Sequence, residues 1–573
     1  MIVSHQLGRH VLIREGQAAS AILSDNGSYL SIGLNSAYNG GFFMLKGRLL
    51  KVVDEIGLPG KITRLTNKIS SIEAVKEDIL ERFYLKKDAL IYELSKPGWV
   101  RLVLDVREPY DSRSWGKNYE ISKIEDRLLI RYTKRADFRD GDKGTDEEYS
   151  LFIAIKSSHK MDYRLVDDWL KKEYIFDKNR GSQHERYVYH AIDIFADKLV
   201  LSIAENKEDA LSKACFFQSK RLNPIDSIKN KEILVAYNCA INSITGLTVE
   251  DNSICAGLPW FFQFWLRDES ISVRSLIDQG RLKTALNILD KQLSFIKDGS
   301  LPTIPGSSLP AMDALGWHFI GWQKLFTVLK GSDKQKIIDK LEIALIDNLN
   351  NFSKDGLAAN SSKETWMDSL DRSGARIEMQ ALRLSMHRFL AVITKKRYYS
   401  KLENNLRVKV RASFMKDNYL IDGIGDETVR PNIFIAAYVY PHLLTKKEWV
   451  ACFEKVLPKL WLDWGGLATV DKESGDFHDA HTGQAPASYH NGDSWFWINN
   501  LAALVMYRIN KERFKPYIEK IIDASTGEIL WKGFIGHHSE LSSAKELKSE
   551  GCLCQAWSSA MYLELIKEVY SLT

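Results

Sequence analysis

"RLKTALNILDKQLSFI", residues 281–296, decides the structural class of the C-terminal part of this chain. Its apolar side chains fall at relative positions 0, 3, 4, 7, 11 and 14, and they are Leu282, Ala285, Leu286, Leu289, Leu293 and Ile296. A period of 3.6 residues places these side chains on one face, which predicts an amphipathic helix. Similar spacing recurs in several segments after residue 227, so the sequence predicts about a dozen helices there and almost no strand.

The first two hundred or so residues have a different period. Segments such as "YLSIGLNS" (29–36), "WVRLVLDV" (99–106) and "KLVLSIAE" (198–205) alternate apolar and polar residues or form short β-branched runs. This pattern predicts an antiparallel β-sandwich. Since 573 residues exceed what one hydrophobic core usually organises, we expect two domains, a β-sandwich over residues 1–225 and an all-α domain over 226–573.

The composition excludes several classes of protein. The 79 basic and 74 acidic residues are mixed along the chain, whereas a nucleic-acid partner would require a clustered basic face. No apolar run approaches the roughly 18 residues of a membrane span, and the first residues lack the apolar core of a signal peptide. The few scattered cysteines, with Cys552 and Cys554 only one residue apart, suit neither a zinc knuckle nor a redox pair. We expect a cytoplasmic, reduced protein.

One short stretch joins aromatic rings to charges. In "PWFFQFWLRDES", residues 259–270, five large aromatic residues precede Arg267 and Asp268. Either a core helix begins here with an ion pair at its rim, or the rings form the floor of a pocket for a polar ligand. Four later segments also combine Trp, Tyr or Phe with charged, amide or imidazole side chains, and long polar connections such as 465–492 separate the helices. Because long loops are usually functional, these segments favour the pocket.

Two carboxyl groups in these segments suit the hydrolysis of a glycosidic bond. That reaction needs one protonated carboxyl group to donate to the leaving oxygen and one ionised group to activate water. Asp368 follows Trp366 and Met367, which disfavour its charged form, whereas Glu540 in "HHSEL" has polar neighbours and is expected in a wetter setting. Alternatively, Asp368 caps a helix and Glu540 is a surface residue.

The helical half resembles the C-terminal glucosidase domain of glycogen debranching enzymes, the amylo-α-1,6-glucosidases. The resemblance rests on "GLPWFFQFWLRDES", "TWMDS", "RPNIFIA", "YHNGDSWFW" and "GCLCQAWSSA", which follow one another in the family's order. The β half is similar in position and length to the N-terminal domain of bacterial and archaeal members, although "AYNGGFFMLKG" only loosely replaces the family's Arg-Tyr-His-Gly-Leu-Leu stretch. The resemblance implies an (α/α)6 barrel of the six-hairpin glycosidase type.

The resemblance also implies roles for residues. Asp368 becomes the acid and Glu540 the base, with Glu546 and Glu550 as rivals for the base. Arg267 and Asp268 would bind hydroxyl groups of a terminal glucose while aromatic rings stack on its faces. The further candidates for substrate binding or its support are Trp265, Asp313, Trp366, Glu378, Arg430, Asn432, Tyr489, His490, Trp495, Gln555 and Trp557.

The activity implied is that of an exo-acting, inverting amylo-α-1,6-glucosidase, which removes α-1,6-linked glucose from glycogen-type α-glucan. Inversion requires the two carboxyl groups to lie roughly 6.5–9.5 Å apart. We expect no transferase barrel of the kind found in the bifunctional eukaryotic enzymes, so the chain should be a glucosidase only or rely on another enzyme. Two alternatives remain open: a glucoamylase- or trehalase-like α-glucosidase, and a non-catalytic carbohydrate-binding or regulatory protein.

No cofactor or metal is expected. "GDFHDAHTG" places Asp476, His478, Asp479 and His481 close together, but polar loop residues of this kind are usually solvated or in contact with substrate. The sequence contains no phosphate-cradling glycine-rich motif and no dinucleotide fingerprint. The expected partner is therefore an α-glucan oligosaccharide, with neither nucleic acid nor membrane.

Overall fold

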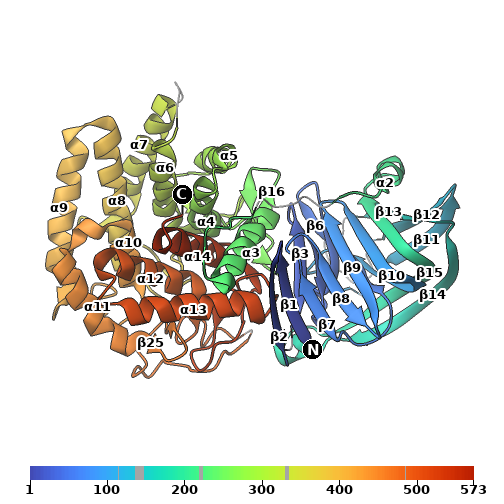
Figure 1. The fold of residues 1–573 in the computed structure, drawn as a ribbon. Helices are drawn as coiled ribbons and strands as arrows, with labels where there is room; N and C mark the ends of the chain where they lie inside the picture. Colours follow the sequence, from blue (N-terminus) through green and yellow to red (C-terminus); the bar gives the residue numbers. More distant parts are fainter. Residues whose placement is uncertain are drawn as a thin grey trace. The chain divides into compact units, whose positions relative to one another are not determined.

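The computed structural model describes residues 1–17, 19–113, 115–135, 148–218, 224–329, 334–483 and 485–572. Its contacts divide the chain into two compact units. The first, which we call the β unit, comprises Met1–Thr248 and Ile529–Gly536. The second, the helical unit, comprises Val249–Glu528 and His537–Thr573. The predicted change from a strand-rich to a helical half is confirmed (Figure 1).

The β unit contains long strands and three helices. The strands are β1 (Ile2–Leu7), β2 (His10–Glu15), β3 (Ala21–Asp25), β4 (Ser28–Ile32), β5 (Gly40–Leu45), β6 (Arg48–Gly57), β7 (Arg64–Asn67), β8 (Ile72–Lys76), β9 (Ile79–Lys86), β10 (Ala89–Arg107), β11 (Lys117–Ile124), β12 (Arg127–Lys134), β13 (Tyr149–Ser157), β14 (Asp162–Glu173) and β15 (Glu185–Ala204). The helices are α1 (Ile175–Asn179), α2 (Lys207–Lys213) and α3 (Lys231–Leu247).

Two long strands, β10 and β15, connect the two groups of strands in the β unit. One row of hydrogen-bonded strands has the order β11-β12-β13-β15-β10-β9-β8-β7-β1-β2. The other strands pair with two members of this row: β14 pairs with β15, and the series β6-β5-β4-β3 is joined to β10 through β6. The first part of β10 pairs with β9, and after an irregularity between Glu93 and Gly98 its second part pairs with β6. The pairs are antiparallel apart from β1 with β7. The β-rich antiparallel prediction is confirmed, and β10 and β15 join its two groups of strands.

The helical unit is built from longer helices and two-residue strand pairs. The helices are α4 (Leu266–Asp278), α5 (Leu282–Leu293), α6 (Ala314–Phe326), α7 (Lys334–Asn351), α8 (Ile377–Thr394), α9 (Arg397–Phe414), α10 (Asn432–Val439), η2 (Pro441–Leu443), α11 (Lys446–Leu460), α12 (Phe496–Asn510), α13 (Lys515–Trp531) and α14 (Ala556–Val569). The strand pairs are β16 (Thr248–Val249) with β17 (Ser253–Ile254), β18 (Gly257–Leu258) with β29 (Cys554–Gln555), β19 (Leu301–Pro302) with β20 (Pro310–Ala311), β21 (Ser353–Lys354) with β22 (Leu357–Ala358), β23 (Met415–Lys416) with β24 (Tyr419–Leu420), β25 (Trp461–Leu462) with β26 (Gly466–Leu467), and β27 (Ser494–Trp495) with β28 (Leu541–Ser542).

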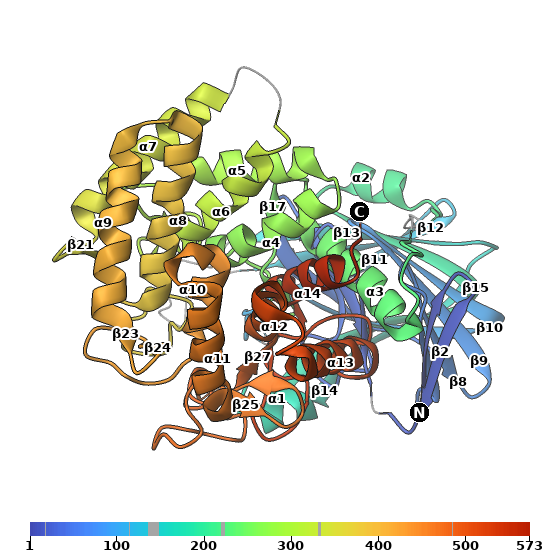
Figure 2. The same cartoon turned by 60° about the vertical axis from the view of Figure 1, so that its left-hand side comes forward.

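Alternate helices close a ring. In the described part of the helical unit, α4, α6, α8, α10, α12 and α14 contact one another in that order, and α14 returns to α4 (Figure 2). We call these helices the inner ring. Helices α10 and α14 are buried on nearly every side, as a ring interior requires, whereas α9 buries only the stripe Tyr399, Leu406, Val410 and Phe414. A one-sided stripe is typical of an outer helix.

Helix α5, from whose apolar spacing the helical class was predicted, buries a different set of side chains from the predicted one. Ala285, Leu289 and Leu293 are buried, but Leu282 is 38% exposed and Ile288 takes its place in the core. Ile296 lies beyond the end of α5 and packs against a separate small core around Leu266 and Leu301. The helix is therefore confirmed, but it ends at Leu293 and its buried face includes Ile288 in place of Leu282.

A buried carboxylate ties the inner ring together. Glu564 of α14 accepts hydrogen bonds from Arg274 of α4 (2.7 Å) and Tyr438 of α10 (2.7 Å), and it pairs with Arg508 of α12 (3.5 Å). Burial alone raises the pKa of Glu564, but the charges of Arg274, Lys324 and Arg508 outweigh burial and hold it at about 2. These partners lie in the second halves of their helices, so the helices that they join run in the same direction.

No helix of the described chain is long and apolar enough to cross a lipid bilayer.

Glu564→Gln should lower the free energy of unfolding at neutral pH by about 3–5 kcal/mol, because it leaves buried cations unpaired. The folded-state pKa lies below the ordinary value of 4.5, so this stabilisation is complete above about 4.5 and is lost as the pH falls towards about 2. The difference between wild type and variant should therefore narrow over that window in urea titrations followed by circular dichroism. The control is Glu568→Gln. Glu568 lies on the same helix as Glu564 and forms a half-exposed ion pair with Arg508, so this variant should lower the free energy of unfolding by only about 0–1 kcal/mol. Equal losses of stability in both variants would contradict the role of Glu564.

Candidate active site

A cavity of about 160 Å³ lies in the helical unit. It is lined by Ala256, Phe261, Trp265, Arg267, Asp268, Trp366, Asp368, Tyr489, Trp495, Glu540, Gln555 and Trp557. Ten of the fifteen residues singled out from the sequence are among them. Asp313, Glu378, Arg430, Asn432 and His490 are not. The sequence analysis missed Ala256 as well as Phe261, although it quoted the aromatic stretch that contains the latter.

The cavity lies where helices of the inner ring begin. Arg267 and Asp268 occupy the first turn of α4, Trp495 precedes α12, and Trp557 opens α14. The β18–β29 and β27–β28 pairs bring the segments before these helices together. Helix starts carry partial positive charge and unpaired N–H groups. This end of the ring therefore favours negatively charged groups.

Asp368 lies beside a buried arginine. Its side chain is 41% exposed, because it faces the cavity, and one carboxylate oxygen lies 3.4 Å from Nη1 of Arg267. Burial in the surrounding protein raises the pKa of Asp368; Arg267 lowers it, and Asp313 raises it again. The net shift is upward, so Asp368 retains its proton to a higher pH than a free aspartate, as a proton donor requires.

The segment that carries Asp368 is held from behind by three predicted residues that do not line the cavity. The backbone N–H of Trp366 donates to Asp313 (2.9 Å), whose other oxygen accepts from Nε of Arg267 (2.7 Å). The indole N–H of Trp366 donates to Oδ1 of Asn432 (2.7 Å). Glu378 pairs with Arg372 (2.8 Å), which in turn donates to Thr365 beside Trp366. Asp313, Asn432 and Glu378 therefore orient this segment.

Glu540 is only 2% exposed, so the expectation of a wetter setting is wrong. Its Oε1 accepts a hydrogen bond from the hydroxyl of Tyr489 (2.5 Å), and its Oε2 accepts one from the backbone N–H of Cys552 (2.9 Å). Hydrogen bonds donated to a carboxylate favour its charged form. Protein donors, rather than solvent, therefore supply the environment that an ionised base needs.

The two rival glutamates do not reach the cavity. Glu546 is exposed, and Glu550 pairs with Lys548 (2.6 Å) while its backbone pairs with Leu541. Neither side chain lines the cavity that holds Asp368. Among the three candidates, only Glu540 faces the same space as the proposed acid.

A buried glutamate that the sequence analysis missed clamps the Glu540 loop. Glu528 of α13 accepts from Nδ1 of His538 (2.6 Å), from the backbone N–H of Ser539 (3.3 Å) and from the hydroxyl of Ser549 (2.5 Å). The other ring nitrogen of His538 lies 3.2 Å from the amide of Asn500. Glu528 thus contacts the loop on both sides of Glu540. Nothing in "STGEIL" distinguishes this residue, because its partners come from distant positions.

Arg430 and His490 also support the cavity from behind. Arg430 donates to the carbonyl oxygens of Thr469 (3.0 Å) and His490 (2.7 Å). The imidazole of His490 stacks on Trp495 with ring centroids 4.9 Å apart and planes 8° from parallel. Its Nδ1 lies 2.7 Å from the hydroxyl of Ser369, next to Asp368. These contacts fix the ring of Trp495.

Asp268 is a third carboxyl group in the cavity. Its Oδ1 accepts a hydrogen bond from the amide of Gln555 (3.0 Å). Burial raises the pKa of Asp268 to about 8, with Arg267 opposing the shift and the charges of Glu540 and Asp368 adding to it. Three carboxyl groups and one guanidinium thus face a small, ring-lined space, an arrangement suited to the hydroxyl groups of a sugar.

The polar segment considered for metal binding has another structural role. Nδ1 of His481 lies 2.8 Å from the buried carboxylate of Asp493. Across the residues that the structure describes, no group of three or more His, Cys, Asp or Glu side chains could hold a metal ion.

Comparisons with known proteins identify a family and a fold. A family model described as amylo-alpha-1,6-glucosidase matches residues 228–564. The structure is similar to a bacterial glucoamylase complexed with acarbose, with a TM-score of 0.64 and 12% identity over 97% of this chain and 94% of that chain. A wild-type glycosidase aligns over 60% of this chain and 99% of its own, with a TM-score of 0.46 and 14% identity. No curated protein matches the sequence. The first structural likeness establishes a glucoamylase-like fold.

Glu528→Gln should loosen the segment that carries Glu540, since an amide cannot accept all the hydrogen bonds that the carboxylate receives. Losing a buried charged acceptor costs about 1–3 kcal/mol, so amide hydrogen exchange in residues 537–552 should accelerate about tenfold or more. The matched control is Glu519→Gln, at an exposed position of the same helix. Identical exchange in both variants would show that Glu528 does not hold this loop.

Proposed function

This chain belongs to the amylo-alpha-1,6-glucosidase family, and from that premise we propose that it is a glycoside hydrolase that removes α-1,6-linked glucose from glycogen-type α-glucan. The observation that carries the proposal is the single small cavity in which Asp368 and Glu540 meet in contrasting environments. The pKa of Asp368 is raised, so that this group retains its proton to a higher pH, whereas Glu540 accepts hydrogen bonds from Tyr489 and from the backbone of Cys552. Inverting hydrolysis needs this difference.

In the proposed reaction Asp368 donates its proton to the glycosidic oxygen as the bond from that oxygen to the anomeric carbon breaks. Glu540 accepts a proton from water, whose oxygen forms a bond to the same carbon from the opposite face. The products are β-glucose and the shortened glucan. Proton exchange with solvent restores both carboxyl groups. The separation of roughly 6.5–9.5 Å that inversion requires stays a prediction.

The walls of the cavity suit one terminal sugar. Arg267 and Asp268 offer hydrogen-bonding groups to hydroxyls, while the indole rings of Trp265, Trp495 and Trp557 offer apolar faces to C–H groups. A volume of about 160 Å³ favours a single residue over an extended chain. We therefore infer exo-action, with the supporting roles of Asp313, Glu378, Arg430, Asn432 and His490 as described above.

The finer architecture and the cellular setting belong to the same proposal. We infer that the inner ring is the inner layer of an (α/α)6 barrel, with α5, α7, α9, α11 and α13 in its outer layer. The proposed domains are an antiparallel sandwich over residues 1–225 and the barrel domain over 226–573. The cysteines are all free, which fits a reducing cytoplasmic compartment.

The linkage is tested by supplying limit dextrin, isomaltose, maltose and trehalose separately and measuring glucose. A debranching glucosidase should release glucose from the α-1,6-linked substrates at a kcat/KM at least tenfold above that for maltose or trehalose. The alternative favoured by the structural likeness, a glucoamylase-like enzyme, would prefer maltose. Binding of glycogen without glucose release from any substrate would instead identify a non-catalytic protein.

The division of labour between the carboxyl groups predicts different responses to substitution. Asp368→Asn should lose about 10²–10⁴-fold in rate on glucans, whose leaving group needs a proton. It should keep much more activity on α-glucosyl fluoride, whose leaving group needs little protonation. Glu540→Gln should be severely impaired on both substrates, because both require activated water. Asp268→Asn should lower kcat/KM by a similar factor for every substrate, as expected when contacts to the transition state are lost.

Two results would overturn these assignments. Equal losses of Asp368→Asn and Glu540→Gln on the fluoride would remove Asp368 as the acid. An active Glu540→Gln combined with an inactive Glu546→Gln or Glu550→Gln would place the base elsewhere. Proton NMR of the first product anomer gives an independent reading, with β-glucose expected.

A further inference from the structure

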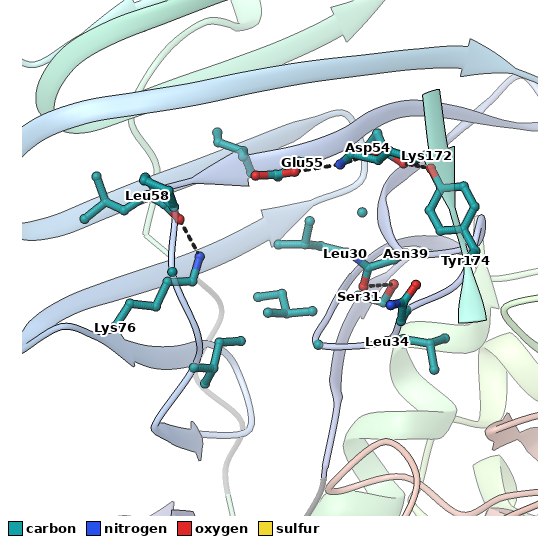
Figure 3. Close-up of a pocket in the computed structure, with 18 of the residues that line it drawn as sticks. Leu30, Ser31, Leu34, Asn39, Asp54, Glu55, Leu58, Lys76, Lys172 and Tyr174 are labelled. Carbon is teal, nitrogen blue, oxygen red and sulfur yellow. Dashed lines mark hydrogen bonds and ion pairs between the residues drawn. The ribbon is translucent and has the colours of Figure 1, made fainter. Parts of the chain in front are cut away.

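A second and larger cavity lies entirely within the β unit. Its volume is about 410 Å³, and its walls come from residues 30–35, 39–40, 54–56, 58–60, 62 and 172–174 together with Lys76 and Phe83 (Figure 3). It contains none of the residues assigned above to hydrolysis. Part of its wall, Asn39 and Gly40, belongs to "AYNGG", the stretch that departs from the family's Arg-Tyr-His-Gly-Leu-Leu sequence.

The floor of this cavity is apolar. Leu30, Leu34, Ile56 and Phe83 are all buried there. Gly40 has a φ of +94°, and a Cβ at this position would overlap the carbonyl oxygen of Val53. Only glycine therefore allows the wall to lie this close to β6. The small exposed parts of these side chains form the apolar part of the lining, against which C–H groups of a ring can pack.

The rim of the cavity is polar and well fixed. Lys172 pairs with Asp54 (2.9 Å) and Glu55 (2.6 Å), and Asp54 also accepts from the hydroxyl of Tyr174 (2.7 Å). Figure 3 shows these groups on one side of the cavity, with Lys76 donating to the carbonyl oxygen of Leu58 (2.8 Å) on the other. A lysine ammonium has three N–H donors. These contacts leave donor capacity on both ammonium groups, and the second carboxylate oxygen of Glu55 can accept.

The balance of charge narrows the class of ligand. The acidic groups Asp54, Glu55 and Glu173 and the basic groups Lys76 and Lys172 all take part in ion pairs. A bound anion or cation would have to compete with those pairs. A purely apolar ligand would displace water from the charged rim and offer no hydrogen bonds in its place, which costs free energy. A neutral polyhydroxylated ring satisfies both surfaces, with hydroxyls on the rim and C–H groups on the floor.

We propose that this cavity is a second saccharide site, which binds a segment of α-glucan in the β unit while the helical unit carries out hydrolysis. The choice of α-glucan rests on the proposed function. The site itself rests on the apolar floor, the paired charges of the rim and a volume larger than that of the acid–base cavity. It would raise the local concentration of polymer for the enzyme without taking part in bond cleavage.

The test measures binding of maltoheptaose by isothermal titration calorimetry in an Asp368→Asn background, which prevents hydrolysis. Glu55→Ala removes a 34% exposed rim acceptor, and Ile62→Trp separately adds a bulky side chain to the lining. Both should remove one binding component or weaken it at least fivefold. Glu93→Ala is the matched control, because Glu93 also pairs with a strand lysine in the β unit, Lys198, but does not line the cavity. It should bind as the parent does.

A second measurement separates this inference from the proposed function. In the otherwise unchanged enzyme, Glu55→Ala and Ile62→Trp should leave kcat/KM on isomaltose unaltered and raise KM on limit dextrin. Maltoheptaose binding that is the same in both cavity variants and in Glu93→Ala overturns the second site, whatever the rate of hydrolysis. If binding depends on Glu55 and Ile62 but the protein releases no glucose, the result supports the second site and contradicts the proposed hydrolase function.

Discussion

The buried carboxylate of Glu564 is the constraint on which the helical unit depends. A charge in a protein interior is stable only when it is paired, and the partners of Glu564 come from different helices of the inner ring. Pairing is therefore possible only when those helices lie side by side and run the same way. Their starts then converge at the opposite end, where Arg267, Trp495 and Trp557 line the small cavity.

At that end, two separate buried clusters impose different conditions on two carboxyl groups. The segment of Asp368 is fixed through Asp313, Asn432 and the Arg372–Glu378 pair, and Asp368 itself meets one arginine. The segment of Glu540 is fixed through Glu528, and Glu540 receives hydrogen bonds from neutral donors. The two carboxyl groups are therefore positioned by different sets of buried contacts.

The sequence predicted those features that depend on local pattern. Helical periodicity identified the helices, and motifs in family order identified most of the cavity wall. It could not predict contacts between distant positions. The face of α5 was misjudged at Leu282 because the neighbouring helices, not the period alone, decide which side is buried. Glu540 has polar neighbours in sequence but is covered by Tyr489 and Cys552 in space. The joining of strands through β10 and β15 likewise depends on pairing that alternation does not encode.

Because Glu528 holds the loop on both sides of Glu540, the position of Glu540 does not depend on the length of that loop. Contacts at Ser539 and Ser549 anchor the loop on both sides, while Lys545, Glu546 and Lys548 between them are exposed. Insertions or deletions within 545–548, after the buried Ser543 and Ala544, would then change the outer surface of the protein and leave the carboxylate where it is. Evolution can vary this surface in length and charge while the chemistry beneath it is conserved, and protein engineers can graft new sequence at the same place.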